Sequence, residues 1–207
     1  MSTPRYIAVA GNIGCGKSTL VDFICRQYGV QPFFEPNAEN PYIVDFYEDM
    51  KTWGFHSQIY FLTHKFRIHQ QLELERGQRT VVQDRTIYED AEIFAANLFR
   101  RRLINKRDWQ MYWDLYETFS QTLTPPDLMI YLRCPLKTLV GRIKKRGRTF
   151  EQKIPRSYLA ALEKLYEEWF ARYDLSPVLV LPTDRLDYVE DLFDRLEVRE
   201  AIARHLR

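Results

Sequence analysis

The sequence predicts an α/β fold in which a parallel β-sheet is covered by helices on both faces. Two observations lead to this prediction: short apolar, β-prone runs alternate with longer segments of helical periodicity, and no internal repeat or linker interrupts the 207 residues. Such alternation is typical of parallel sheets whose strands are buried on both sides. The length suits one compact core, so we expect a single domain over residues 1–207.

The expected elements follow one another along the chain. Strands are predicted at residues 6–10, 32–34, 80–83, 128–132 and 178–181. Helices are predicted at residues 17–28, 55–74, 88–103, 136–145, 157–173 and 189–206. The pair Pro125-Pro126 marks a turn before the fourth strand, because the residue before a proline is disfavoured in a helix.

Composition and charge exclude several classes of protein. The chain is 45% hydrophobic and 28% charged with a formal net charge of +2, so bulk charge indicates neither nucleic acid nor membrane as a partner. No apolar stretch is long enough to cross a bilayer, and the N-terminus lacks the pattern of a signal peptide. Cys15, Cys25 and Cys134 have no metal-ligand spacing, which predicts a reduced, cytoplasmic setting.

A phosphate-binding loop (P-loop) is predicted at residues 11–18, which read GNIGCGKS and match G-x-x-x-x-G-K-[ST]. The motif directly follows a predicted strand and precedes a predicted helix, which is the context that confirms it. Backbone N–H groups and the helix N-terminus then bind phosphate oxygens. We expect Lys17 to reach the β- and γ-phosphates of ATP and Ser18 to bind Mg²⁺. The ATP-binding residues predicted here are Gly11, Asn12, Ile13, Gly14, Cys15, Gly16, Lys17, Ser18 and Thr19.

Asp84 and Arg85 stand at the end of the third predicted strand. A carboxylate at the carboxyl end of a strand beside the P-loop is where a second Mg²⁺-organising group is expected. A helix N-cap explains Asp84 equally well. Arg85 is less common at a cap, and it could contact the reacting phosphate or the acceptor.

Three arginines follow the fourth predicted strand. Arg142 and Arg146 are four residues apart and share a helix face, Gly147 then breaks the helix, and Arg148 lies in the loop. A solvated basic face is the alternative interpretation. Their place after a strand that ends at the phosphate site favours an arginine-bearing lid over about residues 142–151, which stabilises the charge of a transferred phosphoryl group.

Polar residues on the remaining elements predict an acceptor site. Glu35 ends the second strand, where it could orient or deprotonate an attacking hydroxyl. Gln58 and Lys65 flank the apolar stripe of one helix, and Asp90 lies on the next. Buried polar groups need partners, and a nucleobase edge would supply them. A salt bridge between Lys65 and Asp90 without any ligand is an equally good explanation.

Taken together, these motifs resemble the deoxynucleoside kinase family. The segments GNIGCGKST, Glu35-Pro36, YEDMKTWGFHSQIYFLTHKF, DRTIYED and RIKKRGRTFEQKIPRSYL all occur in the order typical of that family. The resemblance implies a P-loop kinase three-layer sandwich with a five-stranded parallel sheet, helices on both faces and an arginine-bearing lid. It also implies ATP as phosphate donor, Mg²⁺ as cofactor and a homodimer.

The resemblance further implies a role for each matching residue. Glu35 would be the general base toward the 5′-hydroxyl of the nucleoside, and Arg85 would hold Glu35 and the acceptor oxygen. Tyr47 and Glu151 would bind the 3′-hydroxyl, which leaves little room for a 2′-hydroxyl. Arg142, Arg146 and Arg148 would cover the phosphates.

The base pocket is implied in the same way. Trp53 would form its wall, Gln58 would read the base edge and Asp90 would assist it. Lys65 stands where many members carry an arginine that pairs with the residue at the position of Asp90.

The expected activity is transfer of the γ-phosphoryl of ATP to the 5′-hydroxyl of a deoxynucleoside, in nucleotide salvage. The segments FHSQIYFLTHKF and QDRTIYEDAEIFA resemble bacterial deoxyadenosine/deoxycytidine kinases, so deoxyadenosine is the expected substrate and deoxycytidine a shared one. A deoxyguanosine kinase is the alternative enzyme. A non-catalytic nucleotide-binding regulatory module is the alternative from another class, and Glu35 together with the lid arginines argues against it, because a switch needs neither.

Overall fold

A computed structural model of the chain describes residues 5–35, 39–184 and 192–205. Its centre is a sheet of five parallel strands in the order β2-β3-β1-β4-β5. The strands are β1 (Tyr6–Ala10), β2 (Gln31–Phe33), β3 (Val81–Asp84), β4 (Leu128–Arg133) and β5 (Val178–Pro182). The predicted α/β fold with five parallel strands is confirmed, and each strand lies within one residue of its expected position.

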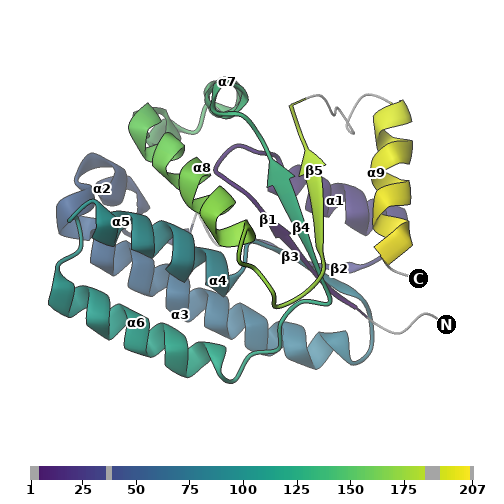
Figure 1. Cartoon of the computed structure of the whole chain (residues 1–207), viewed down its shortest axis with the longest axis horizontal. Coiled ribbons are helices and arrows are strands. Elements are labelled where there is room, and N and C mark those ends of the chain that lie inside the picture. The colour runs from purple at the N-terminus through teal and green to yellow at the C-terminus, as the bar shows by residue number, and fades with distance from the viewer. Residues whose placement is uncertain (1–4, 36–38, 185–191, 206–207) are drawn as a thin grey trace.

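Alternation along β1 explains why both faces of the sheet are covered. Tyr6 and Ala8 belong to one buried cluster, whereas Ile7 and Val9 belong to the other. Because successive side chains of a strand point to opposite faces, a continuous apolar run of this kind needs helices on both sides. Figure 1 shows these two helical layers around the sheet.

One layer consists of α1 (Lys17–Tyr28) and α9 (Leu192–His205), whose Leu20, Ile24, Val198 and Ile202 pack against Ile7 and Val9 in the second cluster. The prediction of a last helix over residues 189–206 is met within the described part; its two ends lie outside the described residues. The other layer is larger. It contains α3 (Met50–Arg76), α8 (Arg156–Phe170) and the segment from α4 (Ile87–Glu89) through η2 (Asp90–Ala95) to α5 (Ala96–Arg100).

Two local features set the bounds of these helices. Asp49 caps α3, since its side chain accepts hydrogen bonds from the N–H groups of Lys51 and Thr52 at 3.1 Å, and α3 therefore begins five residues before the predicted start. The segment η2 is π-helical, a rare form that is frequently found at functional sites. Asp90 is the first residue of η2, so an unusual backbone carries a predicted site residue.

Four helices complete the fold: α2 (Ile43–Glu48), α6 (Lys106–Ser120), α7 (Leu136–Arg146) and the 3₁₀ turn η3 (Thr149–Lys153). The sequence prediction missed α2 and α6. For α6 the signal was present, because Asn105 caps the helix by accepting from Asp108 N at 2.9 Å and aromatic residues recur with helical spacing. Within the described residues, no helix combines the length and the apolar character needed to cross a membrane.

We predict opposite effects of alanine at two glycines that end helices. Gly29 follows α1 with φ of 64°, and Gly77 follows α3 with φ of −70°; a Cβ at either position meets no atom within 4 Å. Gly29→Ala should lower the free energy of unfolding by about 1–2 kcal/mol, because L residues are strained in the left-handed region. Gly77→Ala should raise it by about 0.4–1 kcal/mol through the unfolded chain.

Urea denaturation of both variants checks this prediction. Effects of the same sign and size would contradict the backbone argument, because the two sites are equally open and differ in φ.

Candidate active site

A cavity of about 320 Å³ lies at the carboxyl-terminal edge of the sheet, the edge at which open α/β sheets bind ligands. Phe34, Phe46, Phe61, Phe94 and Phe150 contribute apolar walls. Fifteen of the predicted site residues also line the cavity: Ile13, Gly14, Gly16, Lys17, Ser18, Thr19, Glu35, Tyr47, Gln58, Asp84, Arg85, Asp90, Arg146, Arg148 and Glu151. The fold therefore brings together predicted residues that lie far apart in the chain, from Ile13 to Glu151.

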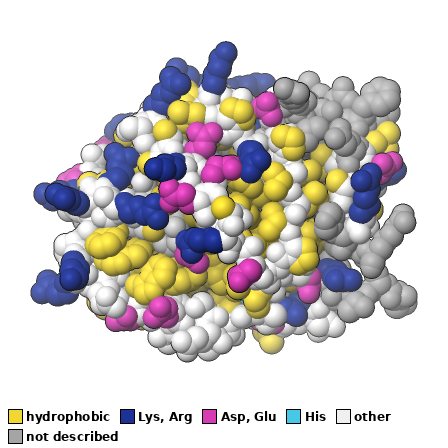
Figure 2. Space-filling model, viewed as in Figure 1, with side chains coloured by type: hydrophobic (Ala, Val, Ile, Leu, Met, Phe, Trp, Pro, Cys, Tyr) yellow, Lys and Arg dark blue, Asp and Glu magenta, His cyan; other side chains and the backbone are white. Residues whose placement is uncertain are grey.

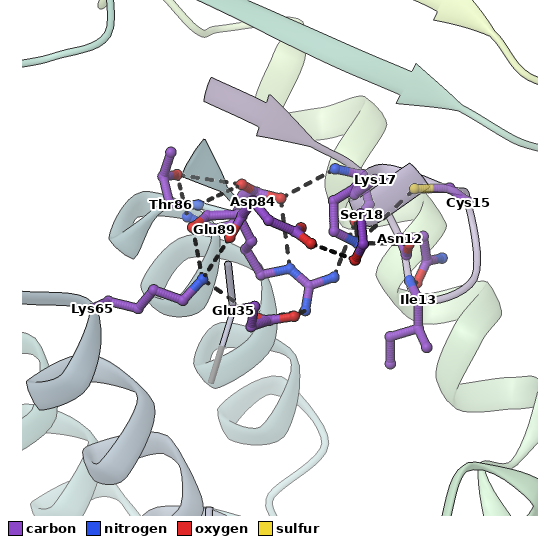
Figure 3. Close-up of polar contacts among 12 residues, drawn as sticks. Asn12, Ile13, Cys15, Lys17, Ser18, Glu35, Lys65, Asp84, Thr86 and Glu89 are labelled. Carbon is purple, nitrogen blue, oxygen red and sulfur yellow. Dashed lines mark hydrogen bonds and ion pairs between the residues drawn. The ribbon is translucent and has the colours of Figure 1, made fainter. Parts of the chain in front are cut away.

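The P-loop forms one end of the cavity. It connects β1 to the N-terminus of α1, and Gly11, Gly14 and Gly16 all have positive φ, at 148°, 83° and 104°. A Cβ at Gly11 would lie 2.9 Å from Leu132 O, so glycine is required there. Lys17 Nζ donates to Gly11 O at 2.9 Å and to Asn12 O at 3.2 Å (Figure 3). The Lys17 ammonium thus binds carbonyls of its own loop, and we expect it to exchange them for phosphate oxygens when ATP binds.

The rest of the loop is held from outside the cavity. Asn12 Nδ2 donates to Leu159 O at 3.0 Å, which ties the loop to α8, and Asn12 Oδ1 accepts from Ile13 N at 2.8 Å. The Cys15 side chain is fully buried beneath the loop, and burial raises the pKa of its thiol. Gly11, Asn12 and Cys15 shape the loop from behind, since they do not line the cavity.

Ser18 and Asp84 meet beside the P-loop. Ser18 Oγ donates to Asp84 Oδ2 at 2.6 Å, whereas the buried Asp84 Oδ1 has no hydrogen-bond partner within the described residues. A hydroxyl and a carboxylate supply the oxygen ligands that Mg²⁺ prefers, with water and phosphate oxygens completing its shell. These two residues therefore fit the predicted magnesium site.

Glu35 and Arg85 form an ion pair inside the cavity. Arg85 Nη1 donates to Glu35 Oε1 at 2.9 Å and to Oε2 at 3.0 Å, and Nη2 donates to Gly11 O at 3.1 Å. The guanidinium also lies 4.3 Å from the centre of the Phe94 ring. Arg85 has φ of 61°, a strained value for this residue type that is typical of functional sites.

Gln58 and Asp90 each provide an unpaired oxygen in the same cavity. Both side chains are buried, and neither Gln58 Oε1 nor Asp90 Oδ2 has a hydrogen-bond partner among the residues that the structure describes. Burial raises the pKa of Asp90 to about 7, while the charge of Lys65 lowers it. Unsatisfied buried acceptors are costly, so their presence in a cavity indicates a ligand that donates hydrogen bonds.

Two of the three predicted lid arginines are held by Glu151. Arg146 Nη2 lies 2.6 Å from Glu151 Oε2, and Arg148 Nη1 lies 3.2 Å from Glu151 Oε1. The Phe150 ring stacks on Tyr47 with centroids 6.1 Å apart, and burial raises the pKa of the Tyr47 hydroxyl. Lys and Arg side chains gather over α7, whose last turn carries Arg146 (Figure 2).

The placement of Arg142 differs from the lid prediction. Its guanidinium donates to Cys15 O at 2.9 Å and to Thr183 O at 2.6 Å, and it does not line the cavity. The reason is geometric: Arg142 and Arg146 share a helix face, but one full turn of α7 separates them, and Arg142 meets backbone carbonyls first. Arg142 joins the P-loop to the residue that follows β5.

Two predicted substrate contacts also lie elsewhere. Trp53 stacks on Tyr42 with centroids 5.7 Å apart and is not among the residues that line the cavity. Lys65 is fully buried behind the cavity, where Nζ donates to Arg85 O at 2.6 Å and Asp84 O at 3.2 Å. The described residues contain no ion pair between Lys65 and Asp90, so the alternative of a plain Lys65–Asp90 salt bridge is not what the structure has.

Glu89 is a functional candidate that the sequence prediction missed. This fully buried carboxylate accepts from Gly11 N at 3.1 Å and Tyr166 OH at 2.8 Å through Oε1. Its Oε2 accepts from Thr86 N at 2.9 Å (Figure 3). The sequence contains part of the signal, because Thr86-x-x-Glu89 is a capping box. Glu89 thereby fixes the start of the P-loop to the residue that follows Arg85.

The fold and this site together define a P-loop phosphotransferase whose cavity holds the Glu35–Arg85 ion pair and two arginines of the predicted lid. Residues 7–207 match the model of the family described as "Deoxynucleoside kinase". The chain belongs to the deoxynucleoside kinase family, and it is an ATP-dependent kinase that phosphorylates the 5′-hydroxyl of a deoxynucleoside.

Individual relatives bear different substrate names. A deoxyadenosine/deoxycytidine kinase of Bacillus subtilis is 38% identical over 189 residues, covering 89% of this chain and 85% of the relative. A deoxyguanosine kinase of the same organism is 33% identical over 217 residues, covering 100% and 98%. Among solved structures, deoxyadenosine kinase from M. mycoides with bound dATP superposes with a TM-score of 0.81 at 34% identity, covering 97% of this chain and 99% of that one.

We predict that Glu89→Gln weakens ATP binding. Glutamine keeps the size but turns one oxygen into an NH₂ group, so either Gly11 N or Thr86 N loses its acceptor. An unsatisfied buried donor costs about 1–3 kcal/mol of stability. The N–H group that loses its acceptor belongs either to Gly11 of the P-loop or to Thr86, which Glu89 links to that loop. The KM for ATP should therefore rise more than the KM for the nucleoside.

Urea denaturation and steady-state kinetics with each substrate varied measure both effects. The matched control is Glu92→Gln in the same segment, whose carboxylate pairs with the exposed Arg172 at 2.6 Å outside the cavity. Equal changes in the two variants would show that Glu89 has no special connection to the P-loop.

Proposed function

We propose that the chain phosphorylates deoxyadenosine in preference to other deoxynucleosides, accepts deoxycytidine as a second substrate, and serves nucleotide salvage as a single kinase domain. One observation carries this proposal: the same cavity holds the buried carboxylate of Glu35 and unpaired oxygens of Gln58 and Asp90, which suit an amino group. These two sets of groups suit the 5′-hydroxyl and the base of one nucleoside.

Glu35 is the proposed general base. Its carboxylate takes the proton of the 5′-hydroxyl while that oxygen attacks the γ-phosphorus of ATP and the bond to the β-phosphate oxygen breaks. Arg85 holds the Glu35 carboxylate through Nη1 and retains Nη2 near the P-loop carbonyl of Gly11. This arrangement supports the role of Arg85 as the group that orients both the base and the acceptor oxygen.

The phosphate end stabilises negative charge. Lys17 is proposed to exchange its loop carbonyls for the β- and γ-phosphates, and Arg146 and Arg148 to move from Glu151 to the phosphoryl oxygens. Ser18 and Asp84 would hold Mg²⁺, which supplies a divalent charge that neutralises phosphate oxygens. Arg142 supports the loop from behind rather than covering the phosphates.

The sugar lies, in this proposal, between Tyr47 and Glu151, which both line the cavity. A phenol and a carboxylate can both bond the 3′-hydroxyl. The stacked ring of Phe150 occupies space beside them, which supports discrimination against a 2′-hydroxyl.

Base choice is proposed to follow from Gln58 and Asp90. Adenine offers an amino donor beside a ring-nitrogen acceptor, which matches the carbonyl oxygen and amide of Gln58, and cytosine offers a similar pair. Guanine offers an oxygen acceptor at that position, which would face Gln58 Oε1 or Asp90 Oδ2 without a hydrogen bond between them. Deoxyguanosine therefore remains the alternative substrate and not the leading one.

We also propose a cytoplasmic homodimer whose partners are ATP and the nucleoside, with no role for nucleic acid or membrane. The three cysteines are free thiols, as a reducing compartment keeps them. The alternative of a non-catalytic regulatory module is disfavoured by the Glu35–Arg85 pair, which a nucleotide switch does not need.

A panel of acceptors tests the proposal. With ATP and Mg²⁺ present, kcat/KM should be highest for deoxyadenosine, second for deoxycytidine and much lower for deoxyguanosine, because a wrong base leaves buried groups unpaired. Adenosine and deoxyadenosine monophosphate serve as acceptors expected to be poor. Gln58→Ala should lower kcat/KM for every base and flatten the ranking. Deoxyguanosine as best substrate of the unmodified enzyme would refute the base assignment.

We predict that Glu35→Gln lowers kcat by about 10²–10⁴-fold, since the amide keeps the shape of the side chain but cannot accept the proton. The Kd for deoxyadenosine, measured by calorimetry, should change little, because this substitution leaves Gln58 and Asp90 in place. Glu48→Gln is the control, as that exposed carboxylate pairs with Lys153 on the surface and such pairs contribute little. Near-normal turnover of a folded Glu35→Gln variant would remove Glu35 from the mechanism.

A further inference from the structure

We propose that Lys65 is a positioning residue, which holds the Glu35 carboxylate and the backbone of Asp84–Arg85 in their reactive arrangement, and that it makes no contact with the base. This inference rests on the proposed role of Glu35 as general base. It assigns the buried lysine of α3 to the phosphoryl-transfer end of the cavity.

Lys65 makes two hydrogen bonds and one ion pair. An ammonium group has three donors. Three oxygens lie around Nζ: Arg85 O at 2.6 Å, Asp84 O at 3.2 Å and Glu35 Oε1 at 3.5 Å (Figure 3). The side chain is fully buried, and all three of these oxygens belong to the protein. Gln58, seven residues earlier on the same helix, lines the cavity, whereas Lys65 does not.

The two backbone carbonyls that Lys65 binds belong to Asp84 and Arg85, where the backbone is strained. Arg85 has φ of 61°, and such a conformation persists only where the surroundings over-determine it. Arg85 N–H donates to Val9 O at 3.0 Å on the side of β1. Lys65 binds the Arg85 carbonyl from the side of α3, so the residue is held at both of its backbone polar groups.

The third contact of Lys65 is an ion pair with the carboxylate of Glu35. Arg85 Nη1 binds both oxygens of this carboxylate, and Lys65 lies beside Oε1 as a second cation. When a nucleoside enters and Arg85 turns part of its guanidinium to the acceptor oxygen, Lys65 still compensates the carboxylate charge. A lysine suits this place because its ammonium is compact and tetrahedral, whereas the planar guanidinium of arginine directs its donors in a flat fork.

Lys65→Met is the decisive variant, because methionine fills the space and removes the three donors. We expect kcat to fall by about 10²-fold, the loss typical of a reacting group displaced by an ångström. The loss should be the same for deoxyadenosine and deoxycytidine, so their ranking stays unchanged. A changed ranking would show that Lys65 contacts the base and would overturn the proposal.

A double-mutant cycle with Glu35→Gln separates positioning from general stabilisation. If Lys65 acts through Glu35, then Lys65→Met added to Glu35→Gln should cost less than about threefold more, because residues that act as a unit are not additive. A full additional loss of about 10²-fold would refute the proposal. Normal turnover of Glu35→Gln alone would instead refute the general-base assignment, so the two failures are distinguishable.

His69→Leu supplies the matched control. His69 is also buried on α3, one turn beyond Lys65, and it bonds Glu73 at 3.2 Å away from the cavity. This variant should lower the Tm yet keep kcat, and a comparable loss of kcat would mean that any disruption of α3 has the same effect. If Lys65→Met does not fold, Lys65→Gln, which keeps one donor group, replaces it in the cycle with the same two criteria.

Discussion

The arrangement of the site depends on the contacts of the Arg85 guanidinium. Arg85 directly follows β3, which lies between β2 and β1. Its Nη1 reaches Glu35 beyond β2, and its Nη2 reaches Gly11 at the end of β1. One planar group therefore joins three neighbouring strand ends. Because those ends come from distant parts of the sequence, their relative positions follow from the strand order and the left-handed backbone at Arg85.

The polar groups of the site differ in whether they already have partners. The cation of Lys17 has them, since it binds carbonyls of its own loop. Gln58 Oε1 and Asp90 Oδ2 have none among the described residues. A phosphate that bound Lys17 would exchange existing hydrogen bonds, whereas a ligand that donated hydrogen bonds to Gln58 and Asp90 would add new ones.

Much of this could be predicted from the sequence, because the decisive signals are local. The glycine spacing of residues 11–18 and the apolar runs of the strands specify the P-loop, the sheet and its carboxyl-terminal edge. Even the missed helix α6 has a local signal, in the cap at Asn105.

The remaining positions depend on backbone atoms that only the folded chain brings near. Lys65 and Arg142 were expected at the ligand, but their charges are satisfied by the carbonyls of Arg85 and Thr183. Periodicity gives the face of a helix and not the depth at which a side chain ends, so it cannot distinguish a residue in the cavity wall from one just behind it. The role of Glu89 also could not be predicted from local sequence, since its hydrogen-bond partner Tyr166 lies 77 residues away in the chain.

The carboxylate of Glu151 sets a condition for any anion that approaches Arg146 and Arg148. It is nearly buried and already pairs with both guanidinium groups, which are partly exposed. Any anion that enters must compete with this internal carboxylate for the same nitrogens. A small anion such as inorganic phosphate or sulfate has only those contacts with which to displace Glu151, whereas a triphosphate is also bound along the P-loop. If these arginines serve as a lid, this competition favours a polyphosphate over a simple anion.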